Sequence, residues 1–139
     1  MKNLKKVSVL AILGVFTLTS MTGCKKYEEG PAVSLKSKKS RVTNEWKIDY
    51  AYDLDDAEVI TDDFLGETWV FSKDGTFTEK DNGTIDKVGT WEFISDKKII
   101  QISIDGTGSS TDEYTILKLK SKEMWLKDKD EELHLIPAN

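Results

Sequence analysis

The sequence TWVFSKDGTFTEK, residues 68–80, has the pattern of a β-hairpin. Residues 68–72 and 76–80 are rich in Thr, Val, Phe and Trp, which favour extended structure. Lys73-Asp74-Gly75 stands between them. Asp-Gly is a strong signal for a tight turn, because glycine accepts the positive φ that such turns require. The stretch therefore predicts two antiparallel strands joined by a short turn.

The same alternation of short strands and turns continues on both sides of this hairpin. Before it, Trp46, Ile48, Tyr50 and Tyr52 recur at every second position, which predicts a strand that has them on one face. We expect eight strands and no helix among them, with strand centres near residues 48, 69, 78, 90, 101, 116, 125 and 134. This spacing is typical of an antiparallel meander. Since an open sheet would leave two exposed edges, we predict an all-β, eight-stranded antiparallel up-and-down barrel.

The first 23 residues have the composition of a targeting segment. Lys2, Lys5 and Lys6 precede an apolar run over residues 7–18. As a helix this run would span roughly 18 Å, which is short of the ~30 Å hydrocarbon core of a membrane. We therefore predict a secretory signal peptide over residues 1–23.

Met21-Thr22-Gly23-Cys24 resembles the lipobox of bacterial lipoproteins. In that motif two small residues let the extended backbone fit into the cleft of the protease. The cysteine thiol that follows them is alkylated by a diacylglycerol donor. The resemblance implies that Cys24 is the lipidated first residue of the mature chain and anchors it to the outer membrane, on either the periplasmic or the cell-surface side. The alternative is an ordinary signal peptide followed by a free thiol.

Residues 24–42 lack a sustained hydrophobic period and contain Gly30-Pro31 and a basic cluster at residues 36–41. They predict a flexible linker behind the lipidated cysteine, or a short helical turn that leads into the first strand. The barrel domain is expected over residues 43–139.

Charge and composition exclude several classes of function. The chain of 139 residues has a net charge of −5, with one cysteine and one histidine. An acidic domain argues against a nucleic-acid partner, and a single cysteine and a single histidine argue against a catalytic or metal centre. His134 alternates with Leu133 and Leu135 and should lie on the opposite face. The acidic connection over residues 53–63 lacks the spacing of a calcium loop, so we expect solvated loops, no metal, no cofactor and no enzymatic activity.

The strand sequences resemble those of small lipocalin-like lipoproteins of Bacteroidota. The resemblance is carried by residues 69–78, by Gly89-Thr90-Trp91, and by the pair Tyr114-Thr115-Ile116-Leu117 and Met124-Trp125-Leu126. It covers nearly the whole mature chain, and it implies a lipocalin-like barrel behind the anchor.

Aromatic residues recur on shared strand faces and are the candidate walls of a ligand cavity. They are Trp46, Tyr50, Tyr52, Trp69, Phe71, Trp91 and Phe93. These rings either line a cavity for a small hydrophobic or amphipathic ligand or fill the barrel completely, since an eight-stranded barrel allows both. The first interior predicts an anchored binding protein. The second predicts a structural or protein-interaction module of the cell envelope, whose partner the sequence does not identify.

Overall fold

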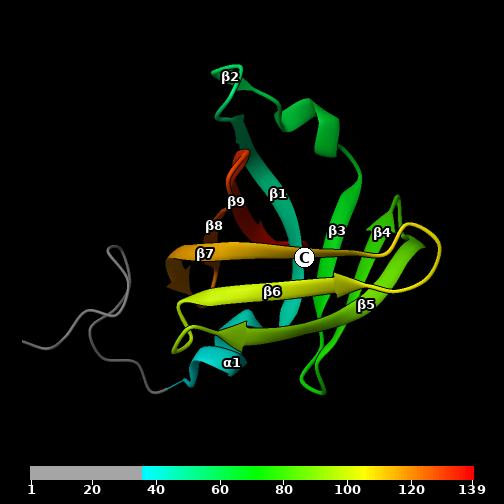
Figure 1. Ribbon diagram of the computed structural model, residues 1–139, viewed down its shortest axis with the longest axis vertical. Coiled ribbons are helices and arrows are strands. Elements are labelled where there is room, and N and C mark those ends of the chain that lie inside the picture. The colour runs from blue at the N-terminus through cyan, green and yellow to red at the C-terminus, as the bar shows by residue number, and fades with distance from the viewer. Residues whose placement is uncertain (1–35) are drawn as a thin grey trace, which may run out of the picture.

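The computed structural model describes residues 36–139 as a closed β-barrel (Figure 1). The predicted signal peptide, Cys24 and most of the predicted linker lie outside the described residues. The barrel strands are β1 Asn44–Asp53, β3 Glu67–Phe71, β4 Thr76–Asp81, β5 Thr84–Ile94, β6 Ile99–Ile104, β7 Ser110–Lys120, β8 Glu123–Lys127 and β9 Glu131–Pro137. A short strand, β2 Glu58–Val59, pairs only with the end of β1.

Each strand from β3 to β8 pairs antiparallel with the next strand in the chain. The first strand closes the barrel, because it pairs with β3 on one side and with β9 on the other. The predicted eight-stranded antiparallel up-and-down barrel is therefore confirmed. The expectation that the barrel would contain no helix needs a correction, since a 3-10 helix, η1 Thr61–Phe64, stands between β2 and β3.

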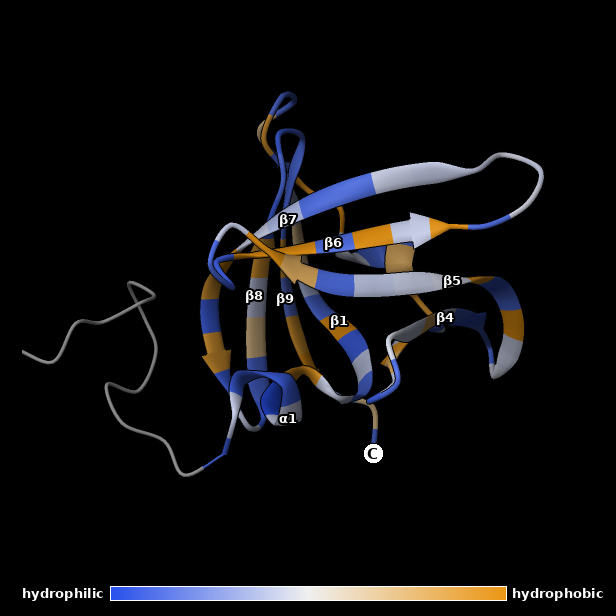
Figure 2. Ribbon diagram, turned by 60° about the horizontal axis from the view of Figure 1, so that its bottom comes forward, coloured by the Kyte–Doolittle hydropathy of each residue, from blue (hydrophilic) through white to orange (hydrophobic). Residues whose placement is uncertain are grey.

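A five-residue helix, α1 Lys38–Val42, precedes β1 and lies at one end of the barrel (Figure 2). Ser37 caps it by accepting a hydrogen bond from the Ser40 amide at 3.0 Å. Arg41 and Val42 are buried against the barrel, and the Arg41 guanidinium donates to the Leu119 carbonyl at 2.9 Å. The helical alternative for the basic stretch is thus the observed one. Residues 38–42 belong structurally to the barrel and not to a flexible linker.

A β-bulge in β1 changes which side chains face inward. The register of β1 against β9 shifts between Ile48 and Tyr50, and Asp49 is the extra residue. Ile48 and Ala51 are therefore both buried, although they are three positions apart. Tyr50 and Tyr52 lie on the outer surface, with Tyr50 opposite His134. The prediction that Tyr50 and Tyr52 share a face with Trp46 and Ile48 is wrong for this reason.

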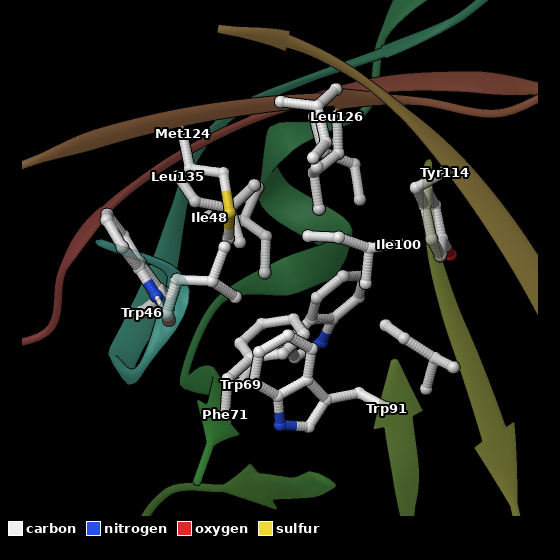
Figure 3. Close-up of a cluster of buried hydrophobic side chains, with 14 of the residues drawn as sticks. Trp46, Ile48, Trp69, Phe71, Trp91, Ile100, Tyr114, Met124, Leu126 and Leu135 are labelled. Carbon is white, nitrogen blue, oxygen red and sulfur yellow. Dashed lines mark hydrogen bonds between the residues drawn. The ribbon is translucent and has the colours of Figure 1, made fainter. Parts of the chain in front are cut away.

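The barrel interior near α1 is filled by aromatic and aliphatic side chains (Figure 3). Phe71 packs edge-to-face on Phe77 and on Trp91, with ring centroids 5.2 and 5.5 Å apart. Trp46 is completely buried and donates through its indole N–H to the Val42 carbonyl at 2.8 Å, which ties α1 to the core. This end of the barrel is solid.

Gly89 allows β5 and β6 to approach each other closely. A Cβ atom at this position would lie 1.9 Å from the Ser103 carbonyl oxygen. We expect Gly89→Ala to lower the free energy of unfolding by about 1–3 kcal/mol, because the two strands must separate to admit the methyl group. Urea unfolding measures the effect. Thr90→Ala, at the neighbouring exposed position, is the control. An unfolding midpoint of Gly89→Ala equal to that of the control would contradict this account.

Candidate functional site

The end of the barrel away from α1 contains a pocket of about 260 Å³. We call it the mouth pocket. Its lining consists of side chains from β3 to β7, from η1 and from the β6–β7 turn: Phe64, Glu67, Trp69, Phe77, Glu79, Lys87, Ile102, Ile104, Gly108, Ser110, Asp112 and Tyr114. On each strand these residues share the inward face with the core, as Glu67 does with Trp69 and Phe71. The mouth pocket is therefore the open end of the barrel interior, with Lys87, Ser110 and Asp112 exposed at its rim.

The apolar part of the mouth pocket is mostly aromatic. The Trp69 ring lies 5.7 Å from the Phe77 ring and 5.7 Å from the Tyr114 ring, measured between centroids. Ile102 is buried beside them, and Phe64 of η1 packs against the same cluster. These side chains present rigid apolar surfaces, which is typical of sites for small organic molecules.

The polar part of the mouth pocket is acidic, with three carboxylates and one ammonium group in its lining. Glu67 accepts a hydrogen bond from the Trp69 indole N–H at 2.6 Å, and burial raises the pKa of its carboxyl. Lys87 forms an ion pair with Glu79 at 2.6 Å, which raises the pKa of the ammonium group. Asp112 accepts a hydrogen bond from the Ser110 hydroxyl at 3.1 Å. The single lysine thus already has a carboxylate partner.

Tyr114 adds a polar group to the apolar wall. The residue is only 8% exposed, and within residues 36–139 its hydroxyl group has no hydrogen-bond partner. Burial raises the pKa of this hydroxyl, and the charges of Glu131 and Asp128 raise it further. The hydroxyl is therefore neutral and can donate or accept a hydrogen bond in the mouth pocket.

Glu131 is a fourth acidic residue at this end of the barrel. It stands two positions before the buried Leu133 on β9, so it is on the inward face of the strand. Burial is the main cause that raises its pKa to about 7, and the charges of Asp128 and Glu67 add to the shift. The influence of Glu67 indicates that Glu131 lies close to the acidic wall of the mouth pocket.

The structure divides the seven predicted cavity residues into three groups. Trp69 lines the mouth pocket. Trp46, Phe71 and Trp91 are buried in the solid core, and Phe93 packs against that core. Tyr50 and Tyr52 lie outside the barrel and cannot reach its interior. Sequence reasoning missed the acidic lining residues, although Glu67 and Glu79 stand two positions from Trp69 and Phe77 and so have the same period-two signal.

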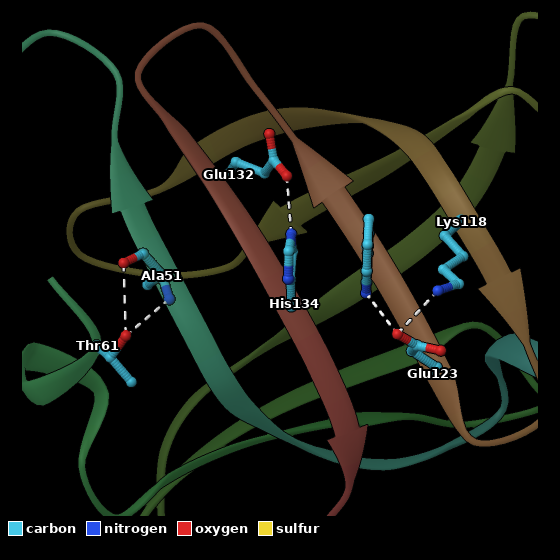
Figure 4. A network of polar contacts seen from close by, with 7 residues as sticks. Ala51, Thr61, Lys118, Glu123, Glu132 and His134 are labelled. Atoms are coloured by element: carbon cyan, nitrogen blue, oxygen red, sulfur yellow. Dashed lines mark hydrogen bonds and ion pairs between the residues drawn. The ribbon is translucent and has the colours of Figure 1, made fainter. Parts of the chain in front are cut away.

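His134 is on the outer surface, opposite in direction to Leu133 and Leu135, as its alternation predicts (Figure 4). Its ring stacks on Trp125 at 3.9 Å between centroids and contacts Glu132 at 2.7 Å. Glu123 accepts hydrogen bonds from the Trp125 indole and from Lys118. This network connects β7, β8 and β9 on the outside of the barrel and gives His134 a structural role.

The acidic connection after β1 is organised by its own backbone. A side-chain oxygen of Asp53 accepts hydrogen bonds from the amides of Asp55 and Asp56, at 2.8 and 2.9 Å. In the part of the chain that the structure describes, no group of three or more His, Cys, Asp or Glu side chains is placed to hold a metal ion. None of the helices described there is long and apolar enough to cross a membrane.

The raised pKa of Glu131 predicts a pH-dependent stability. Between about pH 4.5 and 7 the folded state holds a proton that the unfolded chain has released, so the free energy of unfolding falls as pH rises through this range. Glu131→Gln removes this loss. We expect the variant to be more stable than the unsubstituted protein by on the order of 1 kcal/mol at about pH 8, and equally stable at about pH 4.

Urea unfolding at both pH values measures the difference. Glu92→Gln removes one carboxylate from an exposed position of β5 and is the control. A Glu131→Gln variant that is less stable than the unsubstituted protein at about pH 8 would contradict the burial argument.

Comparison with known proteins identifies the fold. No family model and no curated protein matches the chain. Among solved structures, the chain is similar to a lipocalin-like protein from Bacteroides uniformis, with a TM-score of 0.51 and 13% sequence identity. The match covers 70% of this chain and 98% of the other. The resemblance expected from the sequence is thus confirmed for the fold, and the chain has a lipocalin-like barrel.

Proposed function

We propose that this protein is a non-catalytic, lipid-anchored envelope lipoprotein whose barrel binds a small hydrophobic or amphipathic molecule. The observation that carries the proposal is the mouth pocket, where Trp69, Phe77 and Tyr114 form an apolar wall inside a barrel that is otherwise filled. Its lipocalin-like fold is compatible with this use, since such barrels can enclose one small ligand.

The size of the mouth pocket limits the ligand. Its volume of about 260 Å³ is below the range of roughly 300–1,000 Å³ that is usual for drug-sized ligands. Burial of roughly 200 Å² of apolar ligand surface would contribute about 5 kcal/mol before the entropic cost of association is subtracted. Apolar contact alone therefore gives weak binding, and the polar groups of the lining must supply the rest.

The filled half of the barrel favours a second candidate function. If the mouth pocket holds no ligand, the solid core makes the barrel a stable structural or protein-interaction module of the cell envelope. The outer face over β7, β8 and β9 and the loops would then provide its contacts. Ligand binding and envelope cross-linking distinguish the two functions.

The anchor is proposed on the lipobox-like sequence that ends at Cys24. Two or three acyl chains at this position would make release from the membrane negligible, since each buried CH₂ contributes about 0.8 kcal/mol. We place the protein at the outer membrane and leave the periplasmic and the cell-surface side as alternatives. The residues between Cys24 and α1 would then separate the barrel from the bilayer.

Blocking the mouth pocket tests the ligand-binding proposal. Ile104 is a partly buried lining residue, so Ile104→Trp should fill the pocket with little change in the core. We expect the purified protein to bind the neutral apolar dye N-phenylnaphthylamine, and the variant to bind it at least about tenfold more weakly. Ile85→Trp, at an exposed position of β5, is the matched control. If all three proteins fail to bind the dye, and organic extraction releases no co-purified molecule, the structural alternative is favoured.

The anchor has its own test. We expect Cys24→Ser to leave the precursor unacylated, because serine lacks the nucleophilic thiol that accepts the diacylglycerol. The variant should be lost from the membrane fraction, and metabolic labelling with palmitate should mark only the unsubstituted protein. Recovery of the variant in the membrane fraction at the level of the unsubstituted protein would contradict the proposal.

A further inference from the structure

We propose that the mouth pocket selects small molecules that join an apolar group to a positively charged amine. This inference rests on the proposed ligand-binding function and names the chemical class of the ligand.

The lining of the mouth pocket has an excess of negative charge. Glu67, Glu79 and Asp112 face one cation, Lys87. Lys87 is held by Glu79 at 2.6 Å, so these two charges compensate each other. Glu67 and Asp112 accept hydrogen bonds from neutral groups, the Trp69 indole and the Ser110 hydroxyl. Glu67 and Asp112 therefore form no ion pair with Lys87, whose charge only opposes the rise in the pKa of Glu67.

The acidic character extends beyond the lining. Glu131 lies on the inward face of β9, where the charge of Glu67 helps to raise the pKa of Glu131 and the charge of Glu131 helps to raise the pKa of Tyr114. Asp128 also acts on Glu131 and on Tyr114. A cleft with an excess of charges of one sign concentrates the opposite ion. The field at the mouth pocket thus attracts cations.

Tyr114 supplies a neutral polar group in the apolar wall. Its side chain is more than nine-tenths buried and lines the mouth pocket, and its hydroxyl group has no hydrogen-bond partner within residues 36–139. This hydroxyl oxygen is not one of the fully buried unpartnered atoms of the described residues, so it is open to the mouth pocket and a ligand can reach it. An ammonium group can donate to this oxygen and to a carboxylate at the same time.

The aromatic wall suits the same ligand. Trp69 and Tyr114 present ring surfaces within 5.7 Å of each other, and aromatic rings attract both apolar groups and cations. An anionic amphiphile would instead meet Glu67 and Asp112, and Lys87 could bind it only by releasing Glu79. The mouth pocket should therefore bind a cation more tightly than an anion that has the same apolar group.

Three probes with one aromatic group and different charges test this inference. They are phenethylammonium, phenethyl alcohol and phenylpropionate, and isothermal titration at low ionic strength and about pH 8 keeps the amine protonated. We expect the purified protein to bind the cation most tightly, by at least about tenfold over the anion, with the neutral alcohol between them. Added salt should reduce this difference.

Charge removal locates the effect. Glu67→Gln should weaken the binding of phenethylammonium about tenfold more than that of phenethyl alcohol, since the charge is removed while the side chain keeps its shape. Glu92→Gln, on the exposed face of β5, should change neither.

The outcomes separate this inference from the function on which it rests. Equal binding of the three probes, or a preference for the anion, overturns the cation selectivity while ligand binding stands. Binding of N-phenylnaphthylamine without any binding of phenethylammonium does the same. If neither the dye nor any of the three probes binds, the proposed function itself fails.

Discussion

The pairing of β1 with β9 is the constraint on which the rest of the structure depends. It runs from Trp46 opposite Pro137 to Asp53 opposite Glu131 and joins the first barrel strand to the last. Without it the sheet would have two free edges and no interior. With it, the inward side chains of the core pack against one another, and Trp46, Leu133 and Leu135 are completely buried. The bulge at Asp49 belongs to this closure, because a bulge increases the local twist that a closing strand requires.

Along the closed barrel, the inward residues change from apolar to acidic in the same direction. On β3 the order from the α1 end is Phe71, Trp69 and Glu67. On β9 it is Leu135, Leu133 and Glu131. The barrel therefore has a dry end, which α1 covers, and a wet, negatively charged end. Because both ends use the same strands, the stable core and the candidate site are two parts of one interior. An eight-stranded barrel can be filled or hollow, and this barrel is filled at one end and hollow at the other.

Strand number, strand order and the hairpin turns could be predicted from the sequence, since period-two alternation and the Asp-Gly turn are local signals. The inward face could be predicted only between bulges. The shift at Asp49 placed Tyr50 and Tyr52 outside, and a similar shift between Ile116 and Lys118 keeps both Ile116 and Leu119 buried. A bulge depends on the partner strand, so it leaves no clear trace in the sequence of one strand. The candidate site was missed for a related reason. Only closure of the barrel places Glu67 and Glu131 together on its inward face.

The acidic mouth has an energetic consequence for the protein itself. A carboxylate whose pKa is raised by burial destabilises the folded state above its ordinary pKa, and Glu131 has this property together with Glu67. Asp128, Glu67 and Asp53 all add to the effect at Glu131, so the cost arises from several strands and loops that converge at one end. A site that is unfavourable when empty gains more from an opposite charge than a neutral site would. A ligand that binds only the folded state stabilises that state. A cation bound at this end of the barrel would therefore reverse the destabilisation that burial of the carboxylates creates.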